Sequence, residues 1–200
     1  MKKEIILVLG PQGSGKSTQA KLLADYLDYK FISTGELVRR ESKNGTELAK
    51  KIQFYQLKGE LVPDDIIEKM LFDEMNKSEH FGFLIDGFPR NKNQLKDFLE
   101  FLKINDYSLV KVFYLDVSLN ECLNRIKLRR EIENRPDESE EAVKKRLDIY
   151  FSETAPLLEA YKDLGVLVRI DGERTIEEIQ DELQDIMNEY LEEVRRNNYE

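Results

Sequence analysis

The chain has 200 residues, enough to bury a substantial core, and no break in composition divides it into two independently folded halves. Its 31 Lys and Arg against 40 Asp and Glu give a net charge of −9, which argues against a nucleic-acid-binding surface. One cysteine, Cys122, and one histidine, His80, provide neither an internal disulfide nor the spacing of a zinc site, so we expect a reducing cytoplasm.

The first elements predicted along the chain are a strand, a glycine-rich loop and a helix. Five apolar residues at 5–9 predict a buried parallel strand, and apolar residues recur at helical spacing from Lys16 to Leu27. Between them, Gly10-Pro-Gln-Gly-Ser-Gly-Lys-Ser17 has the spacing of loops that bind nucleoside triphosphates. Its glycines let consecutive N–H groups face one anion, and Lys16 reaches the terminal phosphates. A flexible Gly/Ser turn is the structural alternative.

Four further β-type runs follow, separated by segments of helical periodicity: Lys30–Ile32, Phe83–Ile85, Val110–Leu115 and Val166–Ile170. This alternation predicts an α/β fold in which helices cover both faces of a five-stranded parallel sheet in three layers, and the glycine-rich loop makes it a fold of the P-loop NTPase type. Capping boxes at 118–121 and 175–178 mark two helix starts, and Pro63-Asp64 begins a helix that runs to Met75.

Two segments lack a strand signal. Residues 33–62 are predicted to form two short helices around Lys43-Asn44-Gly45, and this insertion is a candidate mobile flap. The final segment, 191–200, is almost wholly polar, so we expect its helix to fray into a loose tail. The apolar N-terminal run is too short for a signal peptide or a membrane span, and no membrane partner is expected. We expect a monomer because no heptad run or long exposed apolar stripe is visible.

Two charged features point to phosphate chemistry. Asp86 follows the third strand, where an open parallel sheet presents groups to its ligand, and a carboxylate there can hold the hydrated Mg²⁺ that accompanies ATP. Asp-Gly is also a common turn dipeptide. Basic residues cluster between Arg125 and Arg146, which suggests a pocket for polyanions, with a solvated helix face as the alternative.

Five motifs, in order along the chain, resemble those of the adenylate kinases. They are Gly10-Pro-Gln-Gly-Ser-Gly-Lys-Ser-Thr-Gln19, Ile32-Ser-Thr-Gly-Glu-Leu-Val-Arg39, Leu61-Val-Pro-Asp64, Phe83-Leu-Ile-Asp-Gly-Phe-Pro-Arg90 and Lys144-Lys-Arg-Leu147. The resemblance spans nearly the whole chain and implies a reversible transfer of the γ-phosphoryl group of Mg-ATP to AMP, giving two ADP. It also implies a single kinase domain with a helical NMP-binding insertion at about 33–62 and a short lid at about 129–138.

The resemblance further implies which residues form the site. The catalytic residues would be Lys16, Arg90, Arg129, Arg135 and Arg146. ATP would be bound by Gly13, Ser14, Gly15, Lys16, Ser17, Thr18, Arg125, Arg129 and Arg169, the last through its backbone. AMP would be bound by Thr34, Gly35, Arg39, Glu60, Leu61, Val62, Gly87, Phe88, Pro89, Arg90, Gln94, Arg135 and Arg146. Mg²⁺, carried with ATP, would meet Ser17, Thr18 and Asp86, directly or through water, and no zinc is expected.

Two positions favour AMP over other monophosphates. By similarity, AMP kinases carry threonine where Thr34 stands and glutamine where Gln94 stands, whereas relatives acting on UMP and CMP tend to carry alanine and asparagine. Glutamine can donate to and accept from the adenine edge at once. Alternatively, Thr34 caps a helix and Gln94 is solvated. A UMP/CMP kinase of the same fold stays open because only five residues separate Arg129 from Arg135, a short lid that resembles pyrimidine-type enzymes.

An alternative of another class is a nucleotide-binding module without transferase activity. Six arginines from separate segments argue against it, because binding alone does not require such converging charge. Family members usually have glycine directly after the loop lysine, whereas here Ser17 precedes Thr18. Which of these two hydroxyls faces Mg²⁺ is open.

Overall fold

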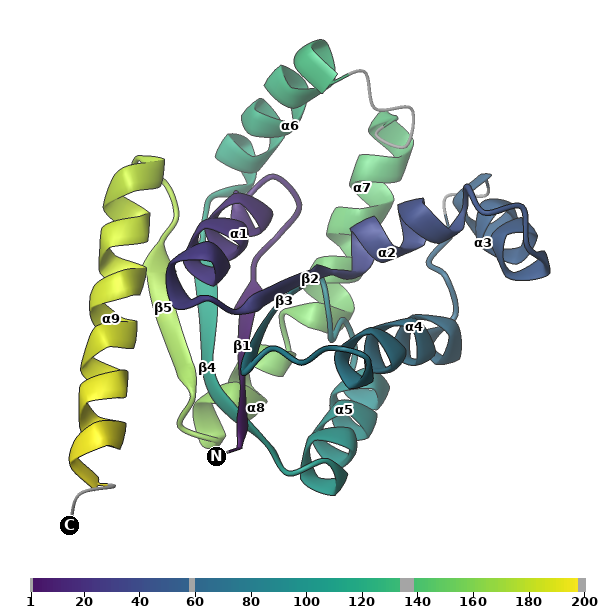
Figure 1. The fold of residues 1–200 in the computed structure, drawn as a ribbon. Coiled ribbons are helices and arrows are strands. Elements are labelled where there is room, and N and C mark those ends of the chain that lie inside the picture. Colours follow the sequence, from purple (N-terminus) through teal and green to yellow (C-terminus); the bar gives the residue numbers. More distant parts are fainter. Residues whose placement is uncertain (1, 58–59, 134–138, 198–200) are drawn as a thin grey trace.

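The computed structural model describes residues 2–57, 60–133 and 139–197, and its centre is a five-stranded parallel sheet in the order β2-β3-β1-β4-β5 (Figure 1). The strands are β1 (Lys3–Leu9), β2 (Lys30–Ser33), β3 (Gly82–Asp86), β4 (Tyr107–Asp116) and β5 (Leu167–Asp171). The helices are α1 (Lys16–Leu27), α2 (Thr34–Glu41), α3 (Glu47–Leu57), α4 (Asp64–Asn76), α5 (Lys92–Ile104), α6 (Leu119–Glu133), α7 (Glu140–Ile149), the π-helix η1 (Tyr150–Thr154), α8 (Leu157–Asp163) and α9 (Ile176–Asn197). The predicted α/β fold is confirmed.

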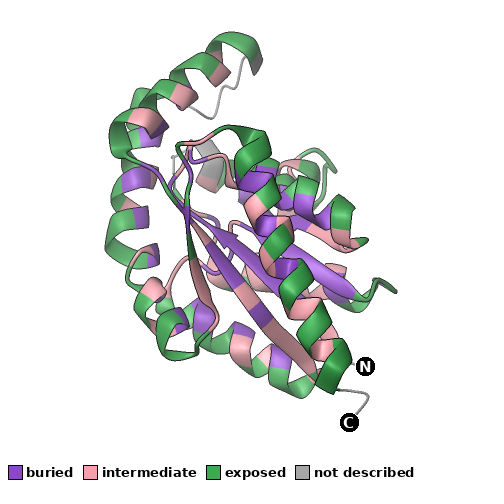
Figure 2. Cartoon of the chain, turned by 90° about the vertical axis from the view of Figure 1, so that its left-hand side faces the viewer, coloured by how far each residue is buried: buried purple, intermediate pink, exposed green. Residues whose placement is uncertain are grey.

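Strand β1 sends alternate side chains to two separate cores. Ile5, Leu7 and Leu9 pack with residues of α4, α5 and α8, whereas Ile6 and Val8 pack with residues of α1 and α9. All five side chains are buried, as expected for a central parallel strand covered on both faces. Figure 2 shows buried residues gathered in the strands and on the inward sides of the helices, with exposed residues on their outward sides. Each buried side chain of this size stabilises the fold by roughly 1.5–3 kcal/mol. The three predicted layers follow from this alternation.

The register of the central strands brings two functional segments together. Val8 of β1 lies opposite Asp86 of β3, so both strands end at the same edge of the sheet. The glycine-rich loop leaves β1 at this edge, and β2, which pairs with β3 on its other side, ends here at Ser33. Parallel strands therefore deliver the loop, Asp86 and the start of α2 to one place.

One of the two predicted capping boxes forms completely. At α9, the Thr175 hydroxyl accepts from the Glu178 N–H at 3.2 Å, while the Glu178 carboxylate accepts from the Thr175 N–H at 3.0 Å. At α6, the Ser118 hydroxyl accepts from the Glu121 N–H and caps the helix. The predicted second bond of this box, from the Ser118 N–H to the Glu121 carboxylate, is wrong. The Ser118 N–H donates instead to Glu173, because the Glu121 carboxylate is engaged by Arg125.

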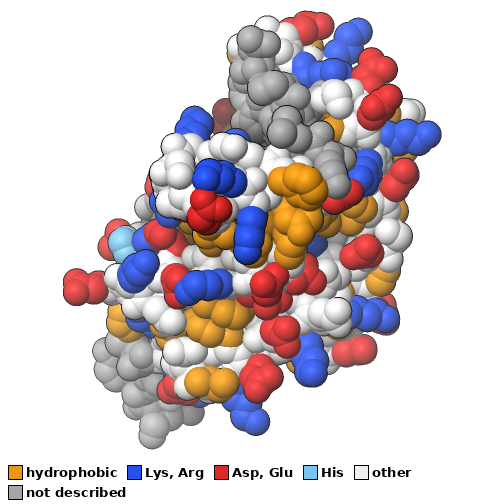
Figure 3. Space-filling view, turned by 90° about the vertical axis from the view of Figure 1, so that its right-hand side faces the viewer, with side chains coloured by type: hydrophobic (Ala, Val, Ile, Leu, Met, Phe, Trp, Pro, Cys, Tyr) orange, Lys and Arg blue, Asp and Glu red, His pale blue; other side chains and the backbone are white. Residues whose placement is uncertain are grey.

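The insertion between β2 and α4 contains the two predicted short helices, α2 and α3, joined around Gly45. Figure 3 shows the side of the molecule that carries α2 to α5, where acidic and basic side chains are interleaved with hydrophobic patches. The predicted lid is described only as far as Glu133, and Arg135 lies outside the described residues.

The predicted loose tail is wrong over most of its length, since α9 continues to Asn197. Leu191 and Val194 are half-buried on the face of α9 that continues the buried Leu183 and Met187. The helix is also tied to the first strand, because the Tyr190 hydroxyl donates to the Glu4 carboxylate at 3.0 Å. The amphipathic face thus outweighs the polar composition. No helix in the described part of the chain has the length and apolar character to cross a membrane.

Candidate active site

The glycine-rich loop wraps tightly at the end of β1 and leads directly into α1, which begins at Lys16. Gly13 has a φ of +89°, and a Cβ there would lie 2.4 Å from the Cys122 carbonyl oxygen of α6. Only glycine tolerates both the backbone angle and this contact. The Lys16 ammonium makes one long hydrogen bond, 3.3 Å, to the Pro11 carbonyl. The Ser14 hydroxyl is buried and has no hydrogen-bond partner among the described residues.

Asp86 closes the cavity from the end of β3. Its Oδ2 accepts from the Ser17 hydroxyl at 2.6 Å and from the Ser33 hydroxyl at 3.3 Å. Its Oδ1 is buried and meets no donor within the described parts of the chain. A carboxylate oxygen without a donor, beside a hydroxyl oxygen, suits a hard cation such as Mg²⁺. The contact with Asp86 also favours Ser17 over Thr18 as the hydroxyl next to the metal.

A cavity of about 380 Å³ opens at this edge of the sheet. Its volume is that of an ordinary small-molecule site. The charged side chains that line it come from helices, a strand and loops far apart in the sequence, and they include Lys16, Arg39, Asp86, Arg90, Arg129 and Arg146. Ser17, Thr18, Thr34, Gly35, Glu60, Leu61, Val62, Gly87, Pro89 and Gln94 line the same cavity. The structure therefore brings together most residues of the predicted site.

The electrostatics of the cavity favour an anionic ligand. Burial lowers the pKa of Lys16, Asp86 opposes this, and the nearby Arg90 and Arg129 lower it further. Burial likewise lowers the pKa of Arg90, opposed by Asp86 and reinforced by Arg146. Buried cations that depress one another's pKa are relieved when an anion binds among them. A phosphate chain is such an anion.

The opposite wall of the cavity is built around Gly87. The Thr34 hydroxyl and the Arg90 Nε both donate to the Gly87 carbonyl, at 3.0 and 2.8 Å. With a φ of +82° and a Cβ position 2.8 Å from the Thr34 hydroxyl, position 87 requires glycine. The Arg39 guanidinium lies over Gly35, 3.3 Å from where a Cβ would stand. Ser33, rather than Thr34, caps α2, so the alternative that Thr34 is the cap is wrong.

Gln94 is buried in this wall, with 3% of its surface exposed, so the alternative of a solvated helix residue is wrong. Its Oε1 accepts from the Arg90 N–H at 2.7 Å, and its Nε2 donates to the Asp64 carboxylate at 2.6 Å. Each amide atom keeps one further hydrogen-bonding position, because an amide oxygen has two lone pairs and its nitrogen two hydrogens.

Some predicted residues do not line the cavity. The Phe88 ring lies in the core, edge-on to Phe98 at a centroid distance of 5.4 Å. Arg169 is exposed, 3.6 Å from Asp116, and its guanidinium lies over the Tyr114 ring. Four further predicted residues do not line the cavity: Gly13, Ser14, Gly15 and Arg125.

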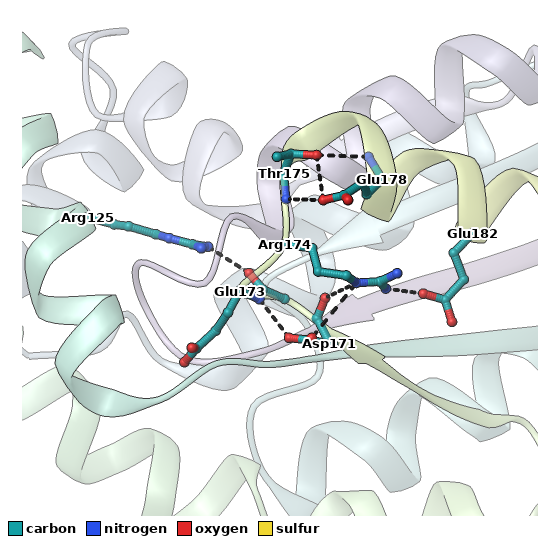
Figure 4. A network of polar contacts seen from close by, with 8 residues as sticks. Arg125, Asp171, Glu173, Arg174, Thr175, Glu178 and Glu182 are labelled. Carbon is teal, nitrogen blue, oxygen red and sulfur yellow. Dashed lines mark hydrogen bonds and ion pairs between the residues drawn. The ribbon is translucent and has the colours of Figure 1, made fainter.

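Arg125 instead joins the glycine-rich loop to the loop after β5. Its Nη1 donates to the Gly172 carbonyl at 2.9 Å and to the Ser14 carbonyl at 3.2 Å. Glu121 holds the guanidinium from one turn earlier on α6, at 2.7 Å. Figure 4 shows Arg125 pointing at the loop that carries Glu173 and Arg174, which is itself tied to α9. Arg125 therefore braces the loop from outside the cavity.

Several cavity residues were missed by sequence reasoning. Tyr150 and Thr154 belong to the π-helix η1, and the Thr154 hydroxyl donates to the Arg90 carbonyl at 2.7 Å. Single π-helical turns are frequent at functional sites, but no composition signal predicts them. Asp64 was named as a helix start and as part of the motif at 61–64 but not as a site residue, although it contacts Gln94. The remaining missed lining residues include Val38, Ile67 and Ile149.

Comparison with known proteins agrees with this geometry. The family model described as adenylate kinase matches residues 8–166. An adenylate kinase of Thermobifida fusca is 41% identical over 175 residues, covering 87% of this chain and 93% of the relative. One of Bifidobacterium longum is 42% identical, with 87% and 94% covered, and one of Methanocella arvoryzae is 36% identical, with 86% and 93% covered. The chain belongs to the adenylate kinase family.

Proposed function

We propose that this protein is an adenylate kinase that transfers the γ-phosphoryl group of Mg-ATP reversibly to AMP and so forms two ADP. The observation that carries the proposal is the convergence of Lys16, Arg90, Arg129 and Arg146 on one cavity beside the glycine-rich loop. Four cations from separate segments, together with Mg²⁺, can oppose the charge of two phosphate chains that meet end to end.

The chemistry requires positioning rather than acid–base catalysis. An attacking phosphate oxygen is already ionised at neutral pH, so no general base is needed. In the proposed arrangement Lys16 binds the β- and γ-phosphates, whereas Arg39 and Arg90 hold the phosphate of AMP. Arg129 and Arg146, joined by Arg135, surround the transferred group. The planar guanidinium suits this role because it binds phosphate through two parallel hydrogen bonds.

Mg²⁺ neutralises phosphate charge when it is bound with ATP. The Ser17 hydroxyl and the Asp86 carboxylate are the groups proposed to hold it, directly or through water, since Asp86 Oδ1 lacks a donor within the described residues. Thr18 also lines the cavity and remains a candidate. That no zinc takes part stays a prediction.

The insertion at 33–62 and the short lid at 129–138 are proposed to move during the reaction. Water at about 55 M competes with AMP for the phosphoryl group, so a site that closes over both substrates suppresses ATP hydrolysis. Arg39 lies on α2 of the insertion and Arg129 lies near the end of α6, so both cations would move with the closing segments. Arg125 and the Arg169 backbone are proposed to lie near the ATP base. We further propose a cytoplasmic monomer.

AMP is the monophosphate that the cavity favours over UMP and CMP. Thr34 and Gln94 are buried in its wall, with 3% of each residue exposed, and both carry hydrogen-bonding groups suited to a base. Glu60, Leu61 and Val62 line the same cavity. The proposed base site therefore lies between the insertion and the start of α5.

Initial rates of ADP formation from ATP and Mg²⁺, measured with AMP, dAMP, UMP and CMP in turn, test this function. We expect rapid turnover of AMP and slow turnover of UMP and CMP. Rapid turnover of UMP or CMP with none of AMP would replace the proposal with the pyrimidine kinase. If none of the four monophosphates gives ADP, the protein is instead a nucleotide-binding module without transferase activity.

A further inference from the structure

The amide of Gln94 is held from both ends by groups of opposite hydrogen-bonding character. The Arg90 backbone N–H can only donate, and it meets Gln94 Oε1 at 2.7 Å. The Asp64 carboxylate, when ionised, can only accept, and it meets Gln94 Nε2 at 2.6 Å. A 180° flip of the amide would place the nitrogen against an N–H donor and the oxygen against a carboxylate. The side chain therefore has one permitted orientation.

Asp64 cannot rotate away to release this hold. Its second oxygen, Oδ2, accepts from Asn91 Nδ2 at 2.8 Å, so both carboxylate oxygens are engaged. Asn91 is fixed in turn, because its Oδ1 accepts from the Gln94 N–H at 2.9 Å and caps α5. Asp64 thus joins the first turn of α4 to the first turn of α5, and the Gln94 amide lies in this closed ring of bonds.

We propose that Asp64 is a positioning residue that selects adenine against 6-oxopurines by fixing the orientation of the Gln94 amide. The inference rests on the proposed function, in which Gln94 faces the base of the monophosphate. Adenine presents an N–H donor at C6, whereas guanine and hypoxanthine present a carbonyl acceptor there. A freely flipping glutamine would pair with either arrangement. A glutamine whose oxygen and nitrogen are held in place pairs with only one.

The size of the selectivity follows from the cost of the mismatched base. A site built to hydrogen-bond one group rejects an analogue that leaves its buried polar atoms unpaired, and we expect AMP to exceed IMP by roughly a hundredfold or more in kcat/KM. IMP is the sharpest probe because its base has the shape of adenine and differs at C6 and in the ring proton beside it. Neither substrate requires a rearrangement of the phosphate side of the cavity.

Asp64→Asn is the variant that tests the proposal, with Asp65→Asn as its matched control. Asparagine keeps the size of Asp64 but can donate as well as accept, so a flipped Gln94 finds a partner. Asp65 is the next residue on α4, is exposed, and loses the same charge on substitution. We expect Asp64→Asn to reduce the AMP-to-IMP ratio of kcat/KM about tenfold, while Asp65→Asn keeps the wild-type ratio. The KM for ATP should be unchanged in both.

A purely structural role for Asp64 gives a different result. Damage to the start of α4 would lower kcat/KM for AMP and IMP by the same factor, and an unchanged ratio in a folded Asp64→Asn protein overturns the proposal. Should that variant not fold, Asp64→Ser keeps a residue favoured near helix starts and replaces the accept-only carboxylate with a shorter hydroxyl that can donate as well as accept, with the same expected fall in the ratio. An unchanged ratio there is equally decisive.

Binding measurements keep this inference separate from the proposed function. Calorimetric titration of AMP and IMP into each protein, without ATP, gives the selectivity with no catalytic step. A preference for binding AMP that weakens in Asp64→Asn supports the role of Asp64 in orienting Gln94, even in a protein that makes no ADP. Equal binding of AMP and IMP by the wild-type protein overturns the proposed role of Asp64, even where ADP is formed rapidly.

Discussion

The two walls of the cavity differ in how far folding alone satisfies their polar groups. In the wall formed by Thr34, Gly87 and Gln94, the side-chain polar groups are paired within the protein at 2.6–3.0 Å. On the side of the glycine-rich loop, Asp86 Oδ1 is buried with no protein partner among the described residues, and Lys16 lies beside it. A wall completed by folding is suited to discriminate shapes, whereas a wall with unpaired groups and excess charge gains most from a ligand.

The largest effect is expected on the wall that lacks partners, at Lys16. Lys16→Met should lower kcat at least a thousandfold, because the cation nearest the terminal phosphates is lost. The denaturation midpoint should stay within a few degrees of the wild type, since burial already lowers the pKa of this lysine and little stability depends on its charge. Lys21→Met, an exposed lysine on the same helix, is the control for kcat. Near-normal kcat in Lys16→Met would move the active site elsewhere.

Arg90 bonds to Gly87 in one wall and lies near Asp86 in the other. Its replacement tests whether AMP binding can be weakened without weakening ATP binding. Arg90→Ala should lower kcat/KM for AMP on the order of a hundredfold, while the KM for ATP changes less than threefold. Arg90→Lys keeps the charge but loses the planar fork and the Nε bond to Gly87, so we expect only partial recovery. Steady-state rates with each substrate varied at saturation of the other give these values. Equal losses for ATP and AMP would contradict the assignment of Arg90 to AMP.

A smaller effect should separate the two hydroxyls after Lys16. Ser17→Ala removes the hydroxyl that contacts Asp86 at 2.6 Å, and we expect kcat to fall about tenfold with a higher Mg²⁺ requirement. Thr18→Ala should change the Mg²⁺ requirement less than twofold. Rates measured across a Mg²⁺ titration compare the two variants. The reverse order of effects would identify Thr18 as the hydroxyl next to the metal.

The smallest effect is expected at Glu68 on α4, whose side chain, unlike those of Thr34 and Gln94, has a buried oxygen that is not paired within the described part of the chain. Its Oε1 is buried without a partner among the described residues, and burial, followed by the repulsion of Asp97, Asp64 and Asp65, raises its pKa to about 7. The folded state therefore binds the Glu68 proton more tightly than the unfolded state, whose ordinary value is 4.5, and stability is lost as the pH rises from 4.5 to about 7.

Glu68→Gln mimics the protonated carboxyl at every pH. We expect the variant to be more stable than the wild type by about 1 kcal/mol at pH 8, a figure reduced for solvent screening, and nearly equal to it at pH 4. Urea denaturation at the two pH values measures the difference. Glu100→Gln, an exposed position on α5, controls for the loss of a surface charge. A pH-independent difference would contradict the titration of Glu68.

Local sequence patterns predicted the strand, loop and helix that carry the site. Most of the features that they did not predict depend on side chains that pair across distant segments. The buried run at 5–9, the loop and α1 follow from periodicity and glycine spacing, and the register that places Asp86 beside the loop follows from parallel pairing. The second partner of Gln94 could not be predicted, because Asp64 lies 30 residues away on another helix. The helical end of α9 depends likewise on the half-buried Leu191 and Val194 and on the bond from Tyr190 to Glu4 rather than on its polar composition.

Arg125 shows the same limit in the opposite direction. The basic cluster that begins at Arg125 predicted a pocket for polyanions, yet Arg129 of the same helix lines the cavity and Arg125 does not. The Arg125 guanidinium is drawn to carbonyls of two loops that meet only in the folded chain, at Ser14 and Gly172. Helical spacing fixes the direction in which a side chain leaves the helix, but its partners depend on the loops that pack there.

In the proposed reaction both nucleotides occupy one cavity at the same time, and the phosphoryl group passes directly between them. Initial rates measured over a grid of ATP and AMP concentrations test it most directly. Direct transfer predicts double-reciprocal lines that intersect, because a complex of the protein with both substrates must form before any product leaves. Parallel lines, together with a phosphorylated protein isolated after incubation with ATP alone, would indicate a covalent intermediate and contradict the account.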